Sequence, residues 1–186
     1  VANRIGVYSM MVAFDEMDKM GLTIEQVDKI AGAPMGRPKS AAFGTADVVG
    51  IDTFAHVSAT CYDKLPDDPE REVYKLPDWV QKLVESGRVG RKSKAGFYKK
   101  EGKEIKVLDH KTLEYRSQEK VRFDSLGAAR KIEDPGERIK ALLAHDDEAA
   151  KFAWNCMART LCYTASLVGE IADDIVNVDR ALRWGF

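Results

Sequence analysis

Two kinds of segment that often carry catalytic chemistry, histidine clusters and glycine-rich loops, form no recognisable site in this sequence. Residues 87–96 are rich in glycine and basic side chains, yet they match neither the Gly-x-Gly-x-x-Gly fingerprint of dinucleotide-binding domains nor a P-loop. We therefore expect no cofactor site within this chain. The three histidines lack the spacing of metal ligands, and we also expect no metal site; they are His56, His110 and His145.

The chain has three cysteines, Cys61, Cys156 and Cys162. An odd and sparse set forms no disulfide framework, and we expect all three to be reduced and buried. A catalytic cysteine–histidine pair is the alternative, but no surrounding sequence supports it. Reduced cysteines suit a cytoplasmic protein.

Composition narrows the class of protein further. The 186 residues are 45% hydrophobic, which suffices for one domain with a sizeable core, or for one domain and part of another. Basic and acidic residues nearly balance at 29 and 30, so nothing draws the whole chain to nucleic acid. No apolar run approaches the roughly 20 residues of a membrane span, and no signal peptide pattern is present. Because the sequence opens with Val1 rather than methionine, we expect a piece of a longer protein.

The pattern along the chain is mostly helical. Apolar residues recur at helical spacing over 1–20, and cover more than half of that helix, which predicts that it is largely buried. Gly21 is expected to end this helix. Thr23 and Gln26 form a capping box that opens a short helix to about residue 31. Asp52 could cap a later helix. Helical periodicity also predicts helices over 40–49, 52–63, 77–86, 135–144, 149–171 and from about 174.

The middle of the chain lacks the strong helical periodicity of the segments before and after it. Gly102 lies between apolar and aromatic runs, which predicts a small β-hairpin near 96–108. Residues 117–134 are polar and indicate a connector. We expect the helix over 149–171 to pack, antiparallel or crossed, against the helix over 1–20.

The two ends of the chain resemble each other. Asn3 lies in an apolar helix 25 positions before the Val-Asp pair ending at Asp28, and Asn155 lies in another, 24 positions before the Val-Asp pair ending at Asp179. This spacing indicates a duplication, although two helix-turn-helix units can resemble each other by chance. Asn155 is followed by cysteine instead of arginine, so we expect it to be structural.

Three motifs in order carry a more specific resemblance. Residues 1–4 (Val-Ala-Asn-Arg) are similar to the end of the Gly-Phe-x-x-Asn-Arg element of 3-hydroxyacyl-CoA dehydrogenases. Residues 34–38 (Pro-Met-Gly-Arg-Pro) and 46–52 resemble the family's Pro-Met-Gly-Pro and Asp-x-Val-Gly-x-Asp region. Residues 90–98 resemble its Gly-Lys-Lys-x-x-x-Gly-Phe-Tyr ending. The chain therefore looks like the helical C-terminal domain of this family.

The resemblance implies a fold and a domain organisation. The expected fold is mostly α, similar to the C-terminal domain of 6-phosphogluconate dehydrogenase, with a small β-hairpin. Residues 1–100 would form the first helical C-terminal-type domain, and 101–145 the hairpin arm and connector. Residues 146–186 would begin a second, truncated helical repeat, as in long multidomain members.

The resemblance also implies a function. The family oxidises L-3-hydroxyacyl-CoA to 3-oxoacyl-CoA with NAD in fatty acid β-oxidation. Its NAD site and catalytic His–Glu pair would lie in an upstream Rossmann domain, so this chain is not expected to be active alone. Asn3 is implied as a catalytic and substrate-binding residue, and Pro34 and Met35 as substrate-binding residues. Expected partners are the acyl-CoA substrate, the Rossmann domain, and a second copy in a homodimer or an intramolecular pseudo-dimer.

Each of these roles has a structural alternative. Asn3 could be an ordinary residue of a helix end, and Met35 could be a core residue in a tight turn. Arg4 could be catalytic, but a structural salt bridge is the simpler interpretation. Three basic residues could contact CoA phosphates or form a solvated face: Arg91, Lys92 and Lys94.

A second hypothesis for the whole chain is a non-catalytic helical module for assembly or dimerisation. Asn3 distinguishes the two hypotheses, because a catalytic role requires its side chain to point away from the helix core.

Overall fold

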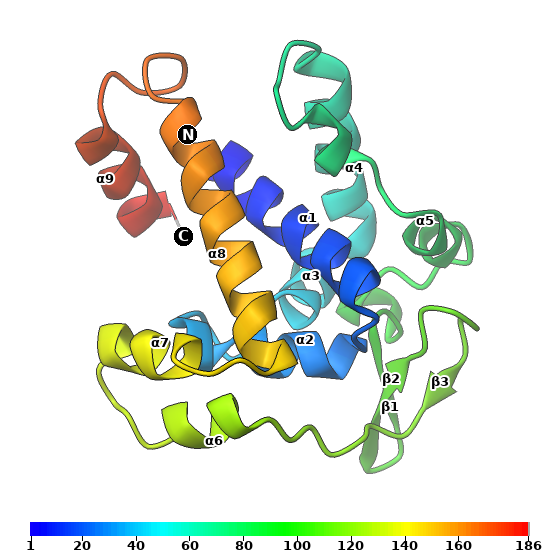
Figure 1. The fold of residues 1–186 in the computed structure, drawn as a ribbon. Helices are drawn as coiled ribbons and strands as arrows, with labels where there is room; N and C mark the ends of the chain where they lie inside the picture. Colours follow the sequence, from blue (N-terminus) through cyan, green and yellow to red (C-terminus); the bar gives the residue numbers. More distant parts are fainter. Residues whose placement is uncertain (186) are drawn as a thin grey trace.

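A computed structural model describes residues 1–185 of the chain, and the expected mostly helical fold is confirmed (Figure 1). The α-helices are α1 Ala2–Met20, α2 Ile24–Ala31, α3 Phe43–Val49, α4 Ile51–Lys64, α5 Asp78–Glu85, α6 Asp124–Ala129, α7 Pro135–Leu143, α8 Glu148–Ser166 and α9 Ile175–Gly185. Short 3-10 turns lie at η1 Ala33–Met35, η2 Arg71–Tyr74 and η3 Arg91–Ser93. No helix within residues 1–185 is long and apolar enough to cross a membrane.

Helix α1 lies at the centre of the fold because most of its surface is apolar. It packs against α8 over a longer stretch than any other pair of helices shares, and the two run in opposite directions (Figure 1). This confirms the predicted contact between the two ends of the chain. Phe14 of α1 is fully buried, with aromatic rings around it from four other segments: Phe43, Phe54, Trp79 and Phe97.

The turn between α1 and α2 is confirmed in detail. Gly21 has φ 66°, a left-handed conformation that an L side chain adopts only at a cost, and it ends α1. The Gln26 amide donates to Thr23 Oγ1 at 3.4 Å, and the Thr23 amide donates to Gln26 Oε1 at 2.8 Å. Both donors lie at the N-terminus of α2, so the capping box satisfies groups that the helix itself leaves without partners.

The predicted hairpin is also confirmed, within a slightly larger sheet. Strand β1 Tyr98–Glu101 pairs antiparallel with β2 Glu104–Leu108 across a turn at Gly102. The chain then turns back, and β3 Tyr115–Arg116 pairs antiparallel with the other edge of β2.

Four local predictions were wrong or incomplete. The helix expected over 149–171 ends at Ser166, because the following turn contains Gly169 at φ 92°, outside helical geometry. Asp52 does not cap α4, since Gly50 occupies the N-cap position. The connector over 117–134 contains the short helix α6. Only Cys156 is buried, and Cys162 lies six positions further along α8, on another face, where it is exposed.

Two carboxylates, the buried Asp47 and the half-buried Asp28, hold the first hundred residues together. Asp47, in α3, accepts hydrogen bonds from the backbone amides of Phe97 at 2.8 Å and Tyr98 at 2.9 Å. Asp28, in α2, accepts from the amides of Phe43 at 2.8 Å and Gly44 at 2.9 Å, at the start of α3. The Tyr98 hydroxyl donates to Asp28 at 2.9 Å, so the two carboxylates share one partner residue. Helices α2 and α3 and strand β1 are thereby joined.

Glycine is required where the chain passes Asp47. A Cβ on Gly96 would lie 2.1 Å from Asp47 Oδ1, and a Cβ on Gly90 would lie 2.4 Å from the Asp47 carbonyl oxygen. Gly90 also has φ 99°. The Gly-Phe-Tyr ending and the Asp-x-Val-Gly region are therefore parts of one docking arrangement, and their role is structural.

Removing the Asp47 carboxylate tests this arrangement. We expect Asp47→Ala to lower the free energy of unfolding by about 2–4 kcal/mol, because two largely buried amides lose their acceptor. Asp52→Ala is the matched control, since Asp52 is exposed and bonds to the exposed Lys92, and it should change little. Urea unfolding of both variants makes the comparison. Equal stability of the two variants would contradict the arrangement.

The same carboxylates should respond to pH. Burial raises the pKa of Asp28 and of Asp47 to about 6, against the opposing effect of their hydrogen bonds. Since 3.8 is the ordinary value, the folded protein binds these protons more tightly than the unfolded chain. The stability that they contribute is therefore fully present below about pH 4 and is lost as pH rises through about 6. Carboxyl-carbon NMR should give midpoints near 6, and midpoints near 4 would refute the expectation.

Candidate functional site

Asn3 lies in the first turn of α1, with its side chain exposed. The amide group makes no hydrogen bond to any other group within residues 1–185. The first backbone N–H groups of a helix have no intrahelical partners and give this end a partial positive charge. The N-terminus of α1 lies beside the end of α8, away from α2 and α7 (Figure 1). Asn3 is thus available to a molecule outside the helix core.

Arg4, the next residue, is held by two buried groups and one exposed carboxylate. Its guanidinium donates to Asp68 Oδ2 at 2.7 Å, to Glu170 Oε1 at 2.5 Å and to the Tyr163 hydroxyl at 3.0 Å. The Asp68 side chain is 0% exposed, and the Tyr163 hydroxyl also donates to it at 2.6 Å. Removing one partner of such a buried ion pair typically costs about 3–5 kcal/mol, so the network can hold the helix end firmly. The salt-bridge interpretation of Arg4 is confirmed.

Segments distant in the sequence supply this network. Tyr163 belongs to α8, Glu170 follows α8, and Asp68 lies in the loop after α4. The Tyr163 ring also stacks on Tyr8 of α1, with centroids 3.8 Å apart. The position of Asn3 therefore depends on groups from both ends of the chain. No sequence pattern indicated these contacts beyond the predicted packing of the two helices.

Asn155, which the sequence spacing predicts to be the counterpart of Asn3, has a different environment. Its amide donates to Glu16 Oε2 at 2.8 Å, and Arg159 pairs with the same carboxylate at 2.6 Å. Glu16 is buried in the interface between α1 and α8. Asn155 is therefore a structural residue, as predicted.

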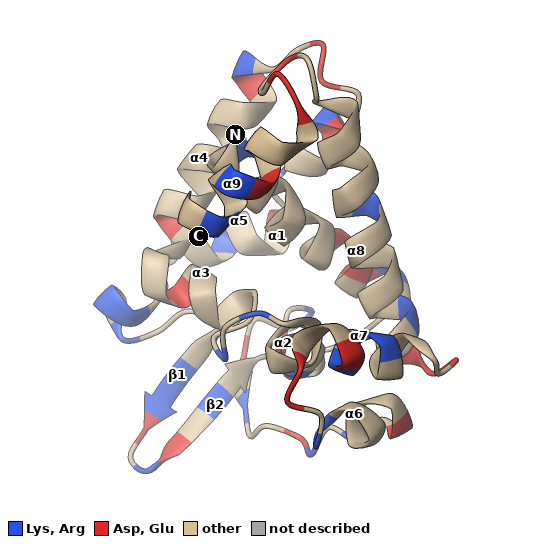
Figure 2. Ribbon diagram, turned by 90° about the vertical axis from the view of Figure 1, so that its left-hand side faces the viewer, with Lys and Arg blue, Asp and Glu red and all other residues tan. Residues whose placement is uncertain are grey.

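The structure does not bring Pro34 and Met35 to Asn3. Met35 is 6% exposed and belongs to the core, in the η1 turn that contacts α2 and α7. Pro34 is half-buried and lines a cavity beside α6. Both views place this turn at the other end of the molecule from the start of α1 (Figures 1 and 2).

The three basic residues after Gly90 make different contacts. Lys92 pairs with Asp52 at 2.7 Å, whereas Arg91 and Lys94 line an open groove.

Neither a metal nor a dinucleotide has an evident place among these residues. Within residues 1–185, no group of three or more His, Cys, Asp or Glu side chains is arranged to hold a metal ion. The sheet in the same residues is small and antiparallel, without the parallel βαβ crevice in which Rossmann domains bind NAD. The residues of this antiparallel sheet and its neighbouring helices, within 1–185, therefore do not fit NAD.

Comparison with known proteins identifies the family. The family model described as "3-hydroxyacyl-CoA dehydrogenase, C-terminal domain" matches residues 1–100. A "Probable 3-hydroxyacyl-CoA dehydrogenase" of Bacillus subtilis is 47% identical over 186 residues, which are 100% of this chain and 23% of that protein. A protein of the same description from Deinococcus radiodurans is 44% identical over 100 residues, 54% of this chain and 28% of the relative.

A more distant relative covers the whole chain as well. A "Putative fatty acid oxidation complex trifunctional enzyme" of Rickettsia felis is 27% identical over 100% of this chain and 25% of its own length. No solved structure matches the chain. The chain spans about a quarter of the length of these relatives. Its sequence motifs, its helical fold and the family match agree, and the chain belongs to the 3-hydroxyacyl-CoA dehydrogenase family, with the family's C-terminal domain in residues 1–100.

Proposed function

We propose that this chain is the substrate-side helical part of an enzyme that oxidises L-3-hydroxyacyl-CoA to 3-oxoacyl-CoA with NAD in fatty acid β-oxidation. The observation that carries the proposal is that Asn3 and Arg4, which are adjacent in the sequence, have opposite environments. The Asn3 side chain is exposed and has no hydrogen-bond partner among the residues that the structure describes, whereas Arg4 is anchored by the buried Asp68.

A neutral amide suits the task proposed for Asn3. The reacting oxygen is a hydroxyl in the substrate and a carbonyl in the product, and the Asn3 N–H can donate to it in both states. Because the amide is uncharged, it does not compete with a neighbouring base for the hydroxyl proton. The Arg4 network limits the movement of the first turn of α1, which keeps such a donor at a fixed position.

The remaining chemistry is proposed to lie outside this chain. A preceding Rossmann domain would bind NAD, the hydride acceptor, and would supply the His–Glu pair that removes the hydroxyl proton. This chain alone would then be inactive. The proposed organisation keeps 1–100 as the first helical domain, 101–145 as arm and connector, and 146–186 as the start of a second repeat. We propose a cytoplasmic location.

The second repeat supports a further proposal, that the chain takes part in a dimer or an intramolecular pseudo-dimer. Helix α8 of this repeat packs on α1, as two copies of one domain would. Its outer face presents Trp154 at 61% exposure and Leu161 at 64%. Exposed apolar residues that cluster on one face are typical of contact surfaces. The same observation favours the alternative function, a helical assembly module that does not touch substrate.

Substitution of Asn3 separates the two functions. In a polypeptide where this chain follows its nucleotide-binding domain, we expect Asn3→Ala to lower kcat at least roughly ten-fold, or ~1.4 kcal/mol of transition-state stabilisation. NAD reduction with a 3-hydroxyacyl-CoA measures the effect. Thermal stability should not change, because the Asn3 side chain is exposed.

Asn155→Ala is the matched control, the same substitution at the equivalent position of the second repeat. It should lower stability, since Glu16 loses a donor, while kcat stays near that of the wild type. If kcat is insensitive to Asn3→Ala, the region is scaffold and interface only. If the wild type oxidises no 3-hydroxyacyl-CoA of any acyl chain length, the chain has the family fold without the activity.

A further inference from the structure

A long groove crosses the face of the molecule opposite the start of α1. Two adjoining cavities of about 960 and 830 Å³ share five lining residues, so they form one continuous depression. Its walls come from α2, the hairpin, residues 118–123 and α6. These elements lie together along the lower edge of the molecule in both ribbon views (Figures 1 and 2). The groove is distinct from the site proposed around Asn3.

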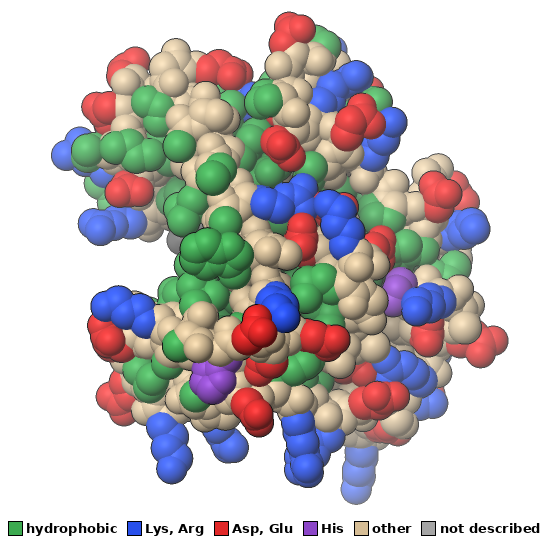
Figure 3. Space-filling view, viewed as in Figure 1, with side chains coloured by type: hydrophobic (Ala, Val, Ile, Leu, Met, Phe, Trp, Pro, Cys, Tyr) green, Lys and Arg blue, Asp and Glu red, His purple; other side chains and the backbone are tan. Residues whose placement is uncertain are grey.

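The groove concentrates positive charge. Ten lysine and arginine residues line it against four carboxylates, a local excess of six positive charges. The whole chain has a net charge of -1, so the rest of the molecule carries an excess of seven negative charges. The space-filling view shows lysine and arginine side chains projecting along this lower edge (Figure 3). Such segregation in a balanced chain creates an attractive field for anions in the groove.

Three of the four carboxylates of the groove are already engaged within the fold. Glu25 pairs with Arg116 at 2.6 Å, and Asp28 and Asp47 accept backbone hydrogen bonds within the fold. By contrast, nine of the ten groove cations form no ion pair within residues 1–185, and only Lys99 pairs with a carboxylate, Glu101, at 2.8 Å. The positive charge is therefore not neutralised internally.

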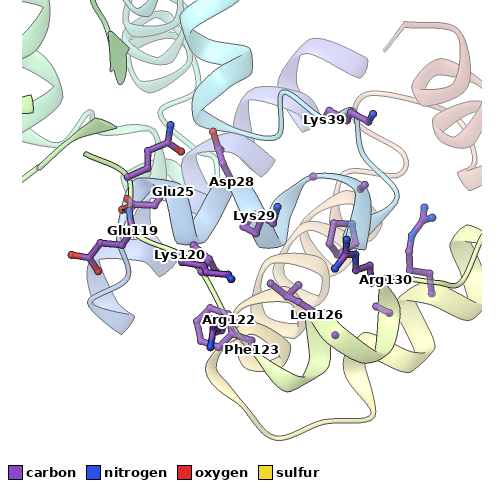
Figure 4. Close-up of a pocket in the computed structure, with 18 residues that line it drawn as sticks. Glu25, Asp28, Lys29, Lys39, Glu119, Lys120, Arg122, Phe123, Leu126 and Arg130 are labelled. Atoms are coloured by element: carbon purple, nitrogen blue, oxygen red, sulfur yellow. Dashed lines mark hydrogen bonds between the residues drawn. The ribbon is translucent and has the colours of Figure 1, made fainter. Parts of the chain in front are cut away.

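The cations approach the groove from more than one element. Figure 4 shows Lys29 coming from α2 and Lys120 and Arg122 from the opposite wall, with Glu25 and Glu119 together at one end. Convergence from two walls is what a multiply charged ligand needs, because separate phosphates can each contact a cation.

The wall of the groove has two further features. Phe123 and Leu126 are half-buried and line the groove beside the buried Ala129, which provides an apolar surface next to the charges. The Nε of Arg138, another lining residue, is buried and has no hydrogen-bond partner within residues 1–185.

We propose that this groove binds a multiply phosphorylated ligand that also carries a flat or apolar group, the chemistry that nucleoside triphosphates and CoA share. The phosphates contact the cations of α2 and of residues 118–130, and the flat group lies against Phe123 and Leu126. The proposal is independent of the dehydrogenase activity, since it concerns another face of the molecule.

Calorimetry on this chain tests the proposal with ATP, CoA and NAD as probes. We expect ATP or CoA to bind, with an affinity that falls as salt increases. The probe that binds more tightly shows whether the groove takes a nucleoside triphosphate or CoA. NAD should not bind measurably, because its cationic nicotinamide ring offsets part of its phosphate charge. Failure of both ATP and CoA to bind would overturn the proposal. Binding of RNA or anionic vesicles without ATP or CoA would also overturn it.

Paired charge reversals locate the site. Lys29→Glu combined with Lys120→Glu should weaken binding of the bound probe at least roughly ten-fold, about 1.4 kcal/mol. Lys64→Glu combined with Lys82→Glu changes net charge equally at exposed positions outside the groove, and should retain the affinity. Melting temperatures of both variants verify folding. Equal loss in the two variants would mean that net charge alone attracts the ligand, and would overturn the assignment to the groove.

Discussion

The ion pair between Arg4 and Asp68 is the interaction on which the candidate site depends. Burying the Asp68 carboxylate is costly unless cations and donors surround it, and Arg4 and Tyr163 are those groups. Glu170 adds a contact from the segment beyond α8. The first turn of α1 is held from three directions as a result. The location of Asn3 is therefore determined by residues that need not contact a substrate themselves.

The family motifs have two different physical meanings in this structure. Asp47, Gly90 and Gly96 fit together within van der Waals distance, so their residue types follow from packing. The Asn-Arg motif instead joins an exposed side chain to an anchored one. A motif match alone does not separate these cases, because both impose strict residue types. Burial and hydrogen bonding separate them, and Asn3 is among the motif residues whose side chains are exposed.

Local signals in the sequence predicted much of the fold. The helix at 2–20, the capping box of Thr23 and Gln26 and the hairpin at Gly102 depend on residues close in the chain, and all three are confirmed. The predicted end of α8 was wrong, because the apolar pattern continues through a turn that contains Gly169 and ends the helix. The Arg4 network and the cationic groove depend on contacts between distant segments, which periodicity does not report.

The distance along the chain between Arg4 and Tyr163 has a consequence for biosynthesis. The two are 159 positions apart. At typical rates of translation, roughly ten to thirty seconds separate the synthesis of α1 from that of Tyr163. During this interval Asp68 and Arg4 lack the hydroxyl and the aromatic face that later cover them. Helix α1 reaches its final surroundings only after α8 has been synthesised, so a ribosome that stalls before α8 leaves a chain in which the first turn of α1 is not yet held in place.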